Sequence, residues 1–531
     1  MPTLSWVGKD KVINHHHEVP FRVLEPQYRF DSPGGSPVNS TDNRIIHGDN
    51  LEALKSLLPE FEGRVNCIYI DPPYNTGNEG WVYNDNVNDP KLQKWLHQVV
   101  GKEGEDLSRH DKWLCMMYPR LKLLRRLLAK DGVFLVSIGD DEFASLAFLL
   151  DEIFGNYNRA AIFTWKSRAK PTNVGSAKFK PQRVAEYIFA YSNNPTKINF
   201  IPVLSGQDRN YPHTLADGRK YRLQTILKSN RGENQRDTMR FELDGFVPPP
   251  TQRWQGGEEF IKNLYATGHI EFKNGIPFRR YFEDDESAEH SPLYTFVSPE
   301  ESGTSESGKN LLNSILGNAH GFDTVKPPEI LERLLSATTR DDGLILDSFA
   351  GSGTTAHAVL KLNAQDGGNR RFILIETMDY AETITAERVR RVMTGYGEGD
   401  SSTPGLGGSF DFYTVGEPIF LDDETINEAV GVDAIRDYVA YSEGICKADR
   451  LGADNPYSPY LLGLNSDTAW VFNYEPDRAT SLDLDFLATL KLTGSKPATV
   501  IIYADRCLLS KEFMVKHGII FKKIPRDITR F

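Results

Sequence analysis

Short apolar runs of strand length alternate with amphipathic helical stretches in two separate parts of this 531-residue chain. The pattern predicts strands at residues 45–46, 65–70, 133–138, 344–346 and 372–375. It predicts helices at residues 50–58, 113–130, 142–154, 328–338 and 353–362. Alternation of this kind favours a parallel sheet covered by helices on both faces. We therefore expect an α/β fold with a doubly wound, mostly parallel sheet.

The alternation stops between about residues 195 and 302, where short polar and aromatic segments favour a separate α+β insert. After a Gly-rich stretch at residues 395–408, the strand-like runs 498–503 and 518–521 predict a small α/β unit. A chain of this length needs several modules. We divide it into an N-terminal arm (1–40), two halves of the main domain (41–194 and 303–415), the insert (195–302) and a C-terminal domain (416–531).

The composition excludes several classes of protein. With 39% hydrophobic and 25% charged residues, the chain lies in the globular range. No run approaches the ~20 apolar residues of a membrane span, and the N-terminus lacks the pattern of a secretory signal. The four cysteines lie far apart, and the adjacent His15, His16 and His17 cannot easily converge on one ion in an extended segment. We expect a cytoplasmic protein without a membrane segment, a disulfide framework or a metal site.

The net charge of −12 is distributed unevenly along the chain. Residues 417–485 carry 15 acidic and 4 basic side chains, so this acidic segment holds nearly all of the excess negative charge. Residues 159–183 hold seven basic side chains and no acidic one. We expect this basic stretch to contact phosphate, although a solvated charged face is the alternative. Its candidate phosphate-binding residues are Lys166, Arg168, Lys170, Lys178, Lys180 and Arg183.

The strand predicted at residues 65–70 runs directly into Asp71, Pro72, Pro73 and Tyr74. Proline removes a backbone donor and disfavours helix in the residue before it, so this loop is stiff and starts at the carboxyl end of the strand. Ligands bind at that edge of an open parallel sheet. A proline-rich turn with a solvated carboxylate is the alternative interpretation.

The strand at residues 344–346 ends in Asp347 and in a turn that contains Gly351 and Gly353. Two close glycines let the backbone approach a ligand. The next strand ends in Glu376, a position where nucleotide-binding folds often place a carboxylate on ribose hydroxyls. Because the third glycine of the dinucleotide fingerprint is absent, the pattern favours an adenosyl cofactor over a nicotinamide.

The segments Asp71-Pro72-Pro73-Tyr74 and Asp347-Ser348-Phe349-Ala350-Gly351-Ser352-Gly353 together resemble the paired motifs of amino-methylating DNA methyltransferases, which use S-adenosylmethionine. The catalytic motif comes first and an insert separates the two, as in the permuted β-group of that family. Further runs at residues 48–54, 75–81 and 326–331 resemble the modification subunits of type III restriction-modification systems. The resemblance covers about residues 10–395 through motifs. It is weaker over the insert and the C-terminal domain, where it rests on layout more than on matched residues.

The resemblance implies a sheet of the S-adenosylmethionine-dependent methyltransferase type, with the insert as the target-recognition domain. It implies that Asp71 and the carbonyl of Pro72 accept hydrogen bonds from a target amine, and that Tyr74 stacks on a flipped base. Pro73 completes the catalytic loop. The implied cofactor contacts are Asp49, Lys326, Pro327, Asp347, Phe349, Gly351, Gly353, Thr354 and Glu376. A helix cap is the alternative role for Asp49.

The resemblance thus implies a site-specific methyltransferase that modifies adenine N6 in double-stranded DNA by base flipping. Cytosine N4 is the alternative target, and Asp71 favours adenine because cytosine enzymes more often carry Ser before Pro-Pro-Tyr. The sequence also leaves open an orphan enzyme without a restriction partner, a catalytically silent DNA-binding specificity subunit and a nucleotide-dependent dehydrogenase. The implied partners are a second copy of this chain and a restriction subunit with helicase and nuclease activity. We expect the C-terminal domain, with its acidic segment, to contact protein.

Overall fold

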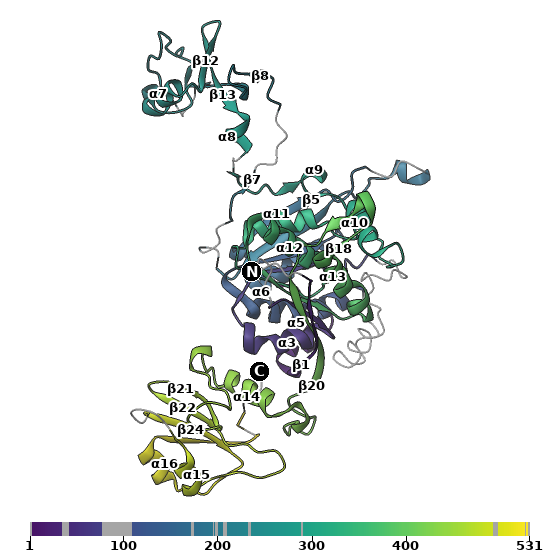
Figure 1. Cartoon of the computed structure of the whole chain (residues 1–531), viewed down its shortest axis with the longest axis vertical. Coiled ribbons are helices and arrows are strands. Elements are labelled where there is room, and N and C mark those ends of the chain that lie inside the picture. Colours follow the sequence, from purple (N-terminus) through teal and green to yellow (C-terminus); the bar gives the residue numbers. More distant parts are fainter. Residues whose placement is uncertain are drawn as a thin grey trace. The chain divides into compact units, whose positions relative to one another are not determined.

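A computed structural model describes residues 3–33, 42–76, 109–170, 175–194, 196, 200–204, 210–231, 235–287, 290–491, 497–525 and 527–528. The chain forms two compact units, one of residues 1–199 with 294–531 and one of residues 200–293. The larger unit is built on a ten-stranded sheet in the order β1-β20-β2-β17-β16-β3-β4-β6-β5-β15 (Figure 1).

The centre of this sheet is parallel. Each strand there runs parallel to its neighbour, in the order β2 (Arg44–His47), β17 (Arg371–Glu376), β16 (Leu344–Asp347), β3 (Val65–Ile70) and β4 (Leu128–Ile138). Their apolar side chains are buried, as expected for strands covered on both faces. The predicted doubly wound α/β fold is therefore confirmed, and the strands that end in Asp347 and Glu376 present their carboxyl ends at one edge.

Amphipathic helices connect these strands and cover the sheet (Figure 1). Helix α3 packs against α5, which packs against α6, and helix α11 packs against α12. Their bounds are α3 (Asn50–Phe61), α5 (Arg109–Leu127), α6 (Phe143–Phe154), α11 (Pro328–Thr338) and α12 (Thr354–Asp366). Each overlaps a helix predicted from the apolar periodicity. In α3, α5, α6 and α11, most of the apolar side chains that formed the pattern are buried.

Strands of mixed direction flank the parallel centre. On one side, β20 (Ser409–Pro418) runs parallel to β2, and β1 (Arg22–Asp31) is antiparallel to β20. On the other side, β6 (Glu186–Ser192) is antiparallel to both β4 and β5 (Arg159–Trp165), and the short β15 (Phe296–Val297) is parallel to β5. The insert therefore leaves the sheet domain after β6 and returns to it at β15.

Strand β1 lies within the segment that we assigned to an N-terminal arm. It is an edge strand that leaves Glu25, Pro26 and Gln27 exposed, so its sequence lacks the continuous apolar run of a central strand. Strand β20 also continues to Pro418, past the boundary that we placed after residue 415. Pairing with neighbours, which a single strand sequence does not encode, draws both segments into the sheet.

The smaller unit, residues 200–293, combines an antiparallel sheet with a helix. The sheet order is β12 (Ile270–Lys273), β13 (Ile276–Phe282), β9 (Lys220–Thr225) and β8 (His213–Thr214). A two-stranded ribbon and helix α7 (Glu258–Ala266) share a core that includes Trp254, Ile261 and Ile270. The α+β fold predicted for the insert is confirmed.

The last part of the chain folds as the small α/β unit that its apolar runs predicted. Its sheet has the order β21 (Leu461–Leu464), β22 (Thr468–Phe472), β24 (Thr499–Ala504) and β26 (Ile519–Lys523), with the last three strands parallel. Helices α14 (Val432–Ser442), α15 (Leu484–Thr489) and α16 (Lys511–His517) accompany it. Among the helices that the structure describes, none has both the length and the apolar composition to cross a bilayer.

Candidate active site

The loop after β3 holds the Asp-Pro-Pro-Tyr segment in one conformation at the carboxyl edge of the sheet. The indole Nε1 of Trp113 donates a hydrogen bond of 2.7 Å to the carbonyl of Pro73. Asn75 adopts a left-handed φ of 57°, and its side-chain amide donates to the buried carboxylate of Glu142. These contacts anchor the end of the loop to helix α5 and to the segment before α6. The rest of the motif predicted at residues 75–81, from Gly77 onward, lies outside the described residues.

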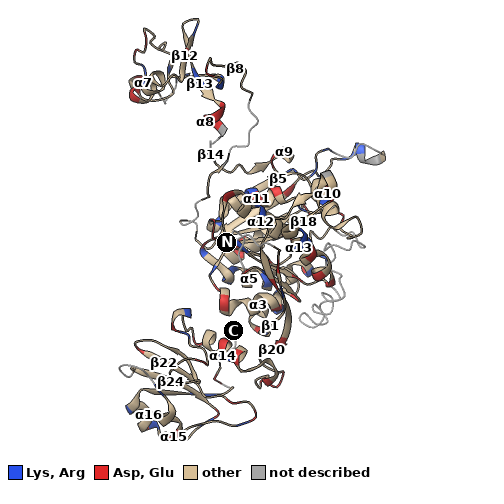
Figure 2. Cartoon of the chain, viewed as in Figure 1, with Lys and Arg blue, Asp and Glu red and all other residues tan. Residues whose placement is uncertain are grey.

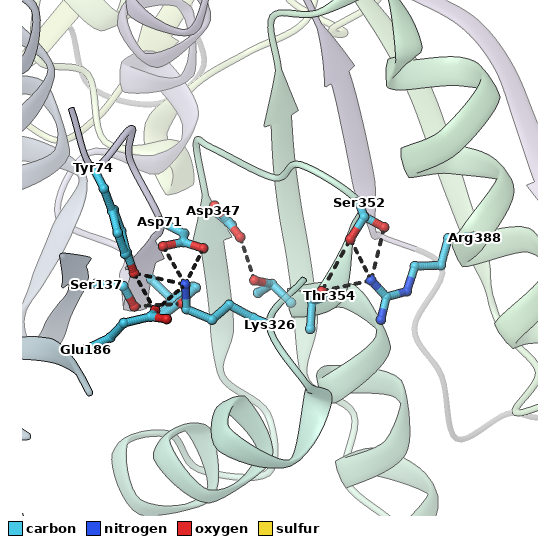
Figure 3. A network of polar contacts seen from close by, with 11 residues as sticks. Asp71, Tyr74, Ser137, Glu186, Lys326, Asp347, Ser352, Thr354 and Arg388 are labelled. Carbon is cyan, nitrogen blue, oxygen red and sulfur yellow. Dashed lines mark hydrogen bonds and ion pairs between the residues drawn. The ribbon is translucent and has the colours of Figure 1, made fainter. Parts of the chain in front are cut away.

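The ammonium of Lys326 binds directly to this loop (Figure 3). Its Nζ lies 2.9 and 2.7 Å from the two carboxylate oxygens of Asp71, and 2.9 Å from the hydroxyl of Tyr74. It also pairs at 3.1 Å with Glu186, at the start of β6, and Glu186 accepts a 2.8 Å hydrogen bond from the Tyr74 hydroxyl. One ammonium, two carboxylates and one phenol thus form a closed cluster.

Burial and charge act in opposite directions in this cluster. Burial raises the pKa of Asp71 above its usual range, and the ion pair with Lys326 offsets this only in part. For Glu186, the attraction of Lys326 and the hydrogen bond from Tyr74 outweigh burial, so its pKa lies below the usual range. Burial also opposes the charge of Lys326, but the carboxylates of Asp71 and Glu186 outweigh it and raise the pKa of the ammonium. Asp71 is therefore the more basic of the two carboxylates.

The turn after β16 is fixed by its own acidic residue. Asp347 accepts hydrogen bonds from the backbone N–H of Phe349 at 3.0 Å and from the hydroxyl of Thr355 at 2.5 Å. Gly351 and Gly353 have φ values of 52° and 80°, which glycine adopts without strain. A Cβ at Gly353 would also lie 3.2 Å from the carbonyl oxygen of Thr385, a tight contact that adds to the conformational preference for glycine.

Glu376, the last residue of β17, supports this turn from behind. Its carboxylate accepts hydrogen bonds from the backbone N–H groups of Gly351 at 2.8 Å and Met378 at 2.9 Å. Burial raises the pKa of Glu376 to about 7, although these two donors favour its charged form. Burial also raises the pKa of Asp347 to about 7, although the donors Thr355 and Phe349 favour its charged form. The pKa values of these two carboxylates therefore lie near neutral pH.

A cavity of about 210 Å³, partly open to solvent, joins the two motifs. Of the residues predicted for the site, its wall includes Asp71, Pro72, Pro73, Tyr74, Lys326, Asp347, Phe349 and Thr354. The described wall does not include Asp49, Pro327, Gly351, Gly353 or Glu376. The structure thus brings the Asp-Pro-Pro-Tyr loop and several residues of the glycine turn to one cavity. Glu376 lies behind the turn.

Asp49 and Pro327 lie at helix starts. The carboxylate of Asp49 caps α3 by accepting from the backbone N–H groups of Leu51 at 2.8 Å and Glu52 at 3.2 Å. Pro327 is the residue before the first turn of α11. Asp49 follows β2, the neighbour of β17, so it still lies at the carboxyl edge of the sheet, and its capping bonds leave a cofactor contact as a proposal.

The basic stretch begins in β5 and continues past its end. Figure 2 shows Lys and Arg in blue on the segment that extends from β5. Arg168 lines the cavity. Lys170, Lys178 and Lys180 are exposed, and Lys166 is partly buried. Arg183 pairs with Asp141 at 2.6 Å and with Asp140 at 3.3 Å, two acidic residues outside the stretch, so part of its charge is neutralised.

Three residues that contact the site were not predicted from the sequence: Trp113, Glu186 and Arg388. Glu186 is the first acidic residue after the basic stretch and starts an apolar strand, which is a usable signal. No comparable signal marks the other two. No group of three or more His, Cys, Asp or Glu side chains suited to a metal ion occurs within the described ranges.

The model of a DNA methylase family matches residues 65–387 of this chain. The Mod subunit of the type III restriction-modification enzyme StyLTI from Salmonella typhimurium is 31% identical over 425 residues, which cover 73% of this chain and 62% of that protein. The EcoPI Mod subunit of Escherichia phage P1 is 31% identical over 419 residues, 70% of this chain and 63% of that protein. The chain therefore spans less than two thirds of the length of these Mod subunits.

The type II methyltransferase M.KpnI of Klebsiella pneumoniae is 30% identical over 376 residues, which cover 64% of this chain and 82% of that protein. Among solved structures, M1.HpyAVI in complex with SAM matches at 16% identity with a TM-score of 0.30, covering 65% of this chain and 98% of that chain. The cytosine-N4-specific PvuII DNA methyltransferase matches at 15% identity with a TM-score of 0.32, covering 67% and 89%.

Proposed function

Because this chain belongs to the DNA methylase family, we propose that it transfers a methyl group from S-adenosylmethionine to adenine N6 in duplex DNA. The observation that carries the proposal is the shared cavity. Its wall contains Asp71 and Tyr74 as well as Asp347, Phe349 and Thr354 from the glycine turn. The names of two relatives, both Mod subunits of type III restriction-modification enzymes, support a role as a modification subunit.

The residues at the carboxyl edge fit this cofactor. The glycine turn lets the backbone approach a ligand, and Phe349 and Leu331 offer apolar surface in the cavity wall. The buried carboxylate of Glu376 suits donation from ribose hydroxyls, and the end of β2 places Asp49 at the same edge. S-adenosylmethionine would supply an electrophilic methyl group on a positively charged sulfur.

The loop from Asp71 to Tyr74 offers the hydrogen-bond acceptors that the target amine needs in this reaction. An adenine N6 lone pair is delocalised into the ring, so the site has to accept the amine hydrogens and favour a pyramidal nitrogen. Each carboxylate oxygen of Asp71 has two lone-pair positions, so the bond from Lys326 leaves room for the amine. The carbonyl of Pro72 is the second acceptor, because Trp113 already engages the carbonyl of Pro73.

Tyr74 presents the ring on which we propose that a flipped base stacks. Its hydroxyl binds both Lys326 and Glu186, which fixes the position of the outer end of the ring and restricts movement of the whole side chain. Gly139, at the carboxyl end of β4, leaves space beside this ring, since a Cβ at Gly139 would lie 3.0 Å from it. The ring is thus held rigidly at the cavity wall.

We also propose the interactions of the other parts. The insert would select the DNA sequence, and the basic stretch would contact phosphate. The C-terminal domain would bind a second copy of this chain or a restriction subunit, since its acidic segment repels DNA and its buried apolar clusters support a folded surface. The protein would act in the cytoplasm, where its proposed substrate lies. Light scattering of the full chain tests the homodimer, and a monomer at micromolar concentration would exclude it.

The chemical test uses methyl-labelled S-adenosylmethionine, the purified chain and duplex DNA of random sequence. We expect label in N6-methyladenine after digestion to nucleosides and mass spectrometry. Label in N4-methylcytosine would show that the target is cytosine N4, the alternative, and not adenine N6. No label in any nucleoside, under conditions where the chain is folded, would exclude the methyltransferase.

A further inference from the structure

The antiparallel sheet of the insert carries a group of polar and aromatic side chains on one face. Residues directly opposite each other on paired antiparallel strands lie on the same face, as do residues two apart on one strand. On β13 and β9, Arg279 lies opposite Gln224, and Tyr281 lies opposite Arg222. These four side chains therefore share a face, and each is partly or fully exposed.

The arginines of these two strands differ in their partners. Arg222 donates through Nε and Nη2 to the two carboxylate oxygens of Glu286, at 2.7 and 2.5 Å. Arg280, on the opposite face of β13, pairs with Glu271 at 3.0 Å. Arg279 forms no side-chain hydrogen bond and no ion pair with the residues that the structure describes, and its Nε is buried. Its two terminal amines therefore remain as donors for a ligand.

Two aromatic rings hold the guanidinium of Arg279 in place. Its Cζ lies 4.4 Å from the ring centre of Tyr281 and 5.9 Å from that of Phe260, on helix α7. A guanidinium is attracted to the face of an aromatic ring, and stacking leaves the donors at its edge available. Arg222, which Glu286 fixes, lies 4.8 Å from the ring centre of Tyr281 and supports that ring. The orientation of Arg279 is thus restricted before a ligand binds.

A fixed guanidinium with two available amines suits one feature of DNA in particular. The O6 and N7 atoms of guanine present two acceptors in the major groove, and a bidentate arginine is the commonest contact that recognises them. Phosphate is the other acceptor on DNA, but a phosphate contact carries no sequence information and requires only a positive charge. The neighbour Gln224 is uncharged and exposed, so it does not repel DNA from Arg279.

We propose that Arg279 recognises a guanine of the target sequence through its two terminal amines. This inference rests on the proposed function, in which the insert selects the DNA sequence. Arg279 is the residue that contacts the base, and Tyr281 and Phe260 are positioning residues that hold its plane. The proposal requires that the sequence methylated by the parent contains a G·C pair.

The experiment compares the parent with Arg279→Ala and Arg279→Lys. Lysine keeps the charge but lacks the two parallel donors of arginine. Arg280→Lys is the matched control, because it makes the same change one position away, on the opposite face of the strand. Sequencing that detects modified bases, on DNA from cells that express each variant, gives the methylated motif. Rates with duplexes that carry each of the four base pairs at every motif position give the discrimination.

We expect both Arg279 variants to lose discrimination at one position, occupied by a G·C pair in the parental motif, by about five- to 150-fold. Discrimination at the other positions should stay within about twofold of the parent, and Arg280→Lys should keep the whole motif. If Arg279→Ala does not fold, Arg279→Lys decides alone.

Three results overturn the inference. One is an unchanged motif in both Arg279 variants, and another is a parental motif without a G·C pair. The third is a uniform loss on all duplexes in Arg279→Ala, with a salt slope lower by about 0.9 and parental behaviour in Arg279→Lys, which would assign Arg279 to a phosphate. Each of these results needs a parent that methylates one motif, whereas a parent that methylates no DNA overturns the proposed function itself.

Discussion

The ammonium of Lys326 lies 2.9 and 2.7 Å from the two carboxylate oxygens of Asp71, although 255 positions separate the two residues in the chain. The ion pair joins the part of the sheet domain that precedes the insert to the part that follows it. We expected Lys326 at the cofactor pocket. Because it binds Asp71, we propose instead that it positions the loop from Asp71 to Tyr74. The consequence of this ion pair is that Asp71 has a fixed position and a lower proton affinity than burial alone would give it.

We predict that Lys326→Met lowers the rate of methyl transfer by about hundredfold or more, because it leaves the buried carboxylate of Asp71 unpaired. Removing the ammonium raises the pKa of Asp71 further, so the remaining activity should increase with pH as the carboxylate forms. Calorimetry should show S-adenosylhomocysteine binding within about threefold of the parent. Lys309→Met, which removes an exposed ion pair with Asp323, is the control and should keep the parental rate. Parental activity in Lys326→Met would exclude this role.

For Tyr74, we predict that the ring and the hydroxyl have separable effects. Tyr74→Ala removes the stacking surface and should weaken binding of DNA with an unpaired target base by about five- to hundredfold, as base stacking is worth about 1–3 kcal/mol. Tyr74→Phe keeps the ring and removes only the hydroxyl that binds Lys326 and Glu186, so DNA binding should stay near the parental value. Equal losses in both variants would assign the residue to packing.

Binding of the cofactor product should depend on pH through Glu376, whose pKa burial raises to about 7. Ribose hydroxyls donate to the carboxylate form, so binding favours the deprotonated state. The affinity for S-adenosylhomocysteine should therefore increase as pH rises, by about tenfold from pH 6 to pH 8 for one group with this pKa.

The control for this dependence is Glu376→Gln, which cannot titrate. It should bind S-adenosylhomocysteine more weakly at pH 8 and with a nearly flat pH profile. Because burial also raises the pKa of Asp347 to about 7, a slope that persists in Glu376→Gln would assign the titration to Asp347. A flat profile in the parent would contradict a titrating carboxylate at the ligand.

The basic stretch after β5 should contribute to DNA binding without selecting sequence. Replacing Lys166, Arg168 and Lys170 by Ala should weaken binding to all duplexes and reduce the slope of log K against log salt by roughly 0.9 for each phosphate that the variant no longer binds. Removing Lys511 and Lys516, two exposed residues of α16 in the C-terminal domain, is the matched control and should leave the slope unchanged. An unchanged slope in the triple variant would remove the stretch from the interface.

The sequence predicts those parts of the fold and site that short segments encode. Asp71, Asp347 and Glu376 were identified because each follows an apolar strand, and parallel strands bring their carboxyl ends to one edge. Strand β1 was not identified, because its pairing with β20 depends on segments nearly 400 positions apart. Arg388 was not identified either. Its burial and its hydrogen bonds to Ser352 and Thr354 follow from packing of α13 (Glu387–Thr394) against the turn, which no local pattern records.

Sequencing that detects modified bases, on DNA from cells that express either the parent or Asp71→Ala, tests the central claim most directly. We predict N6-methyladenine at one sequence motif with the parent and none with the variant. The purified variant should still bind S-adenosylhomocysteine within about tenfold, because Asp71 acts on the target amine. Modified cytosine with the parent, no modified base with the parent, or unchanged adenine methylation with Asp71→Ala would contradict the account.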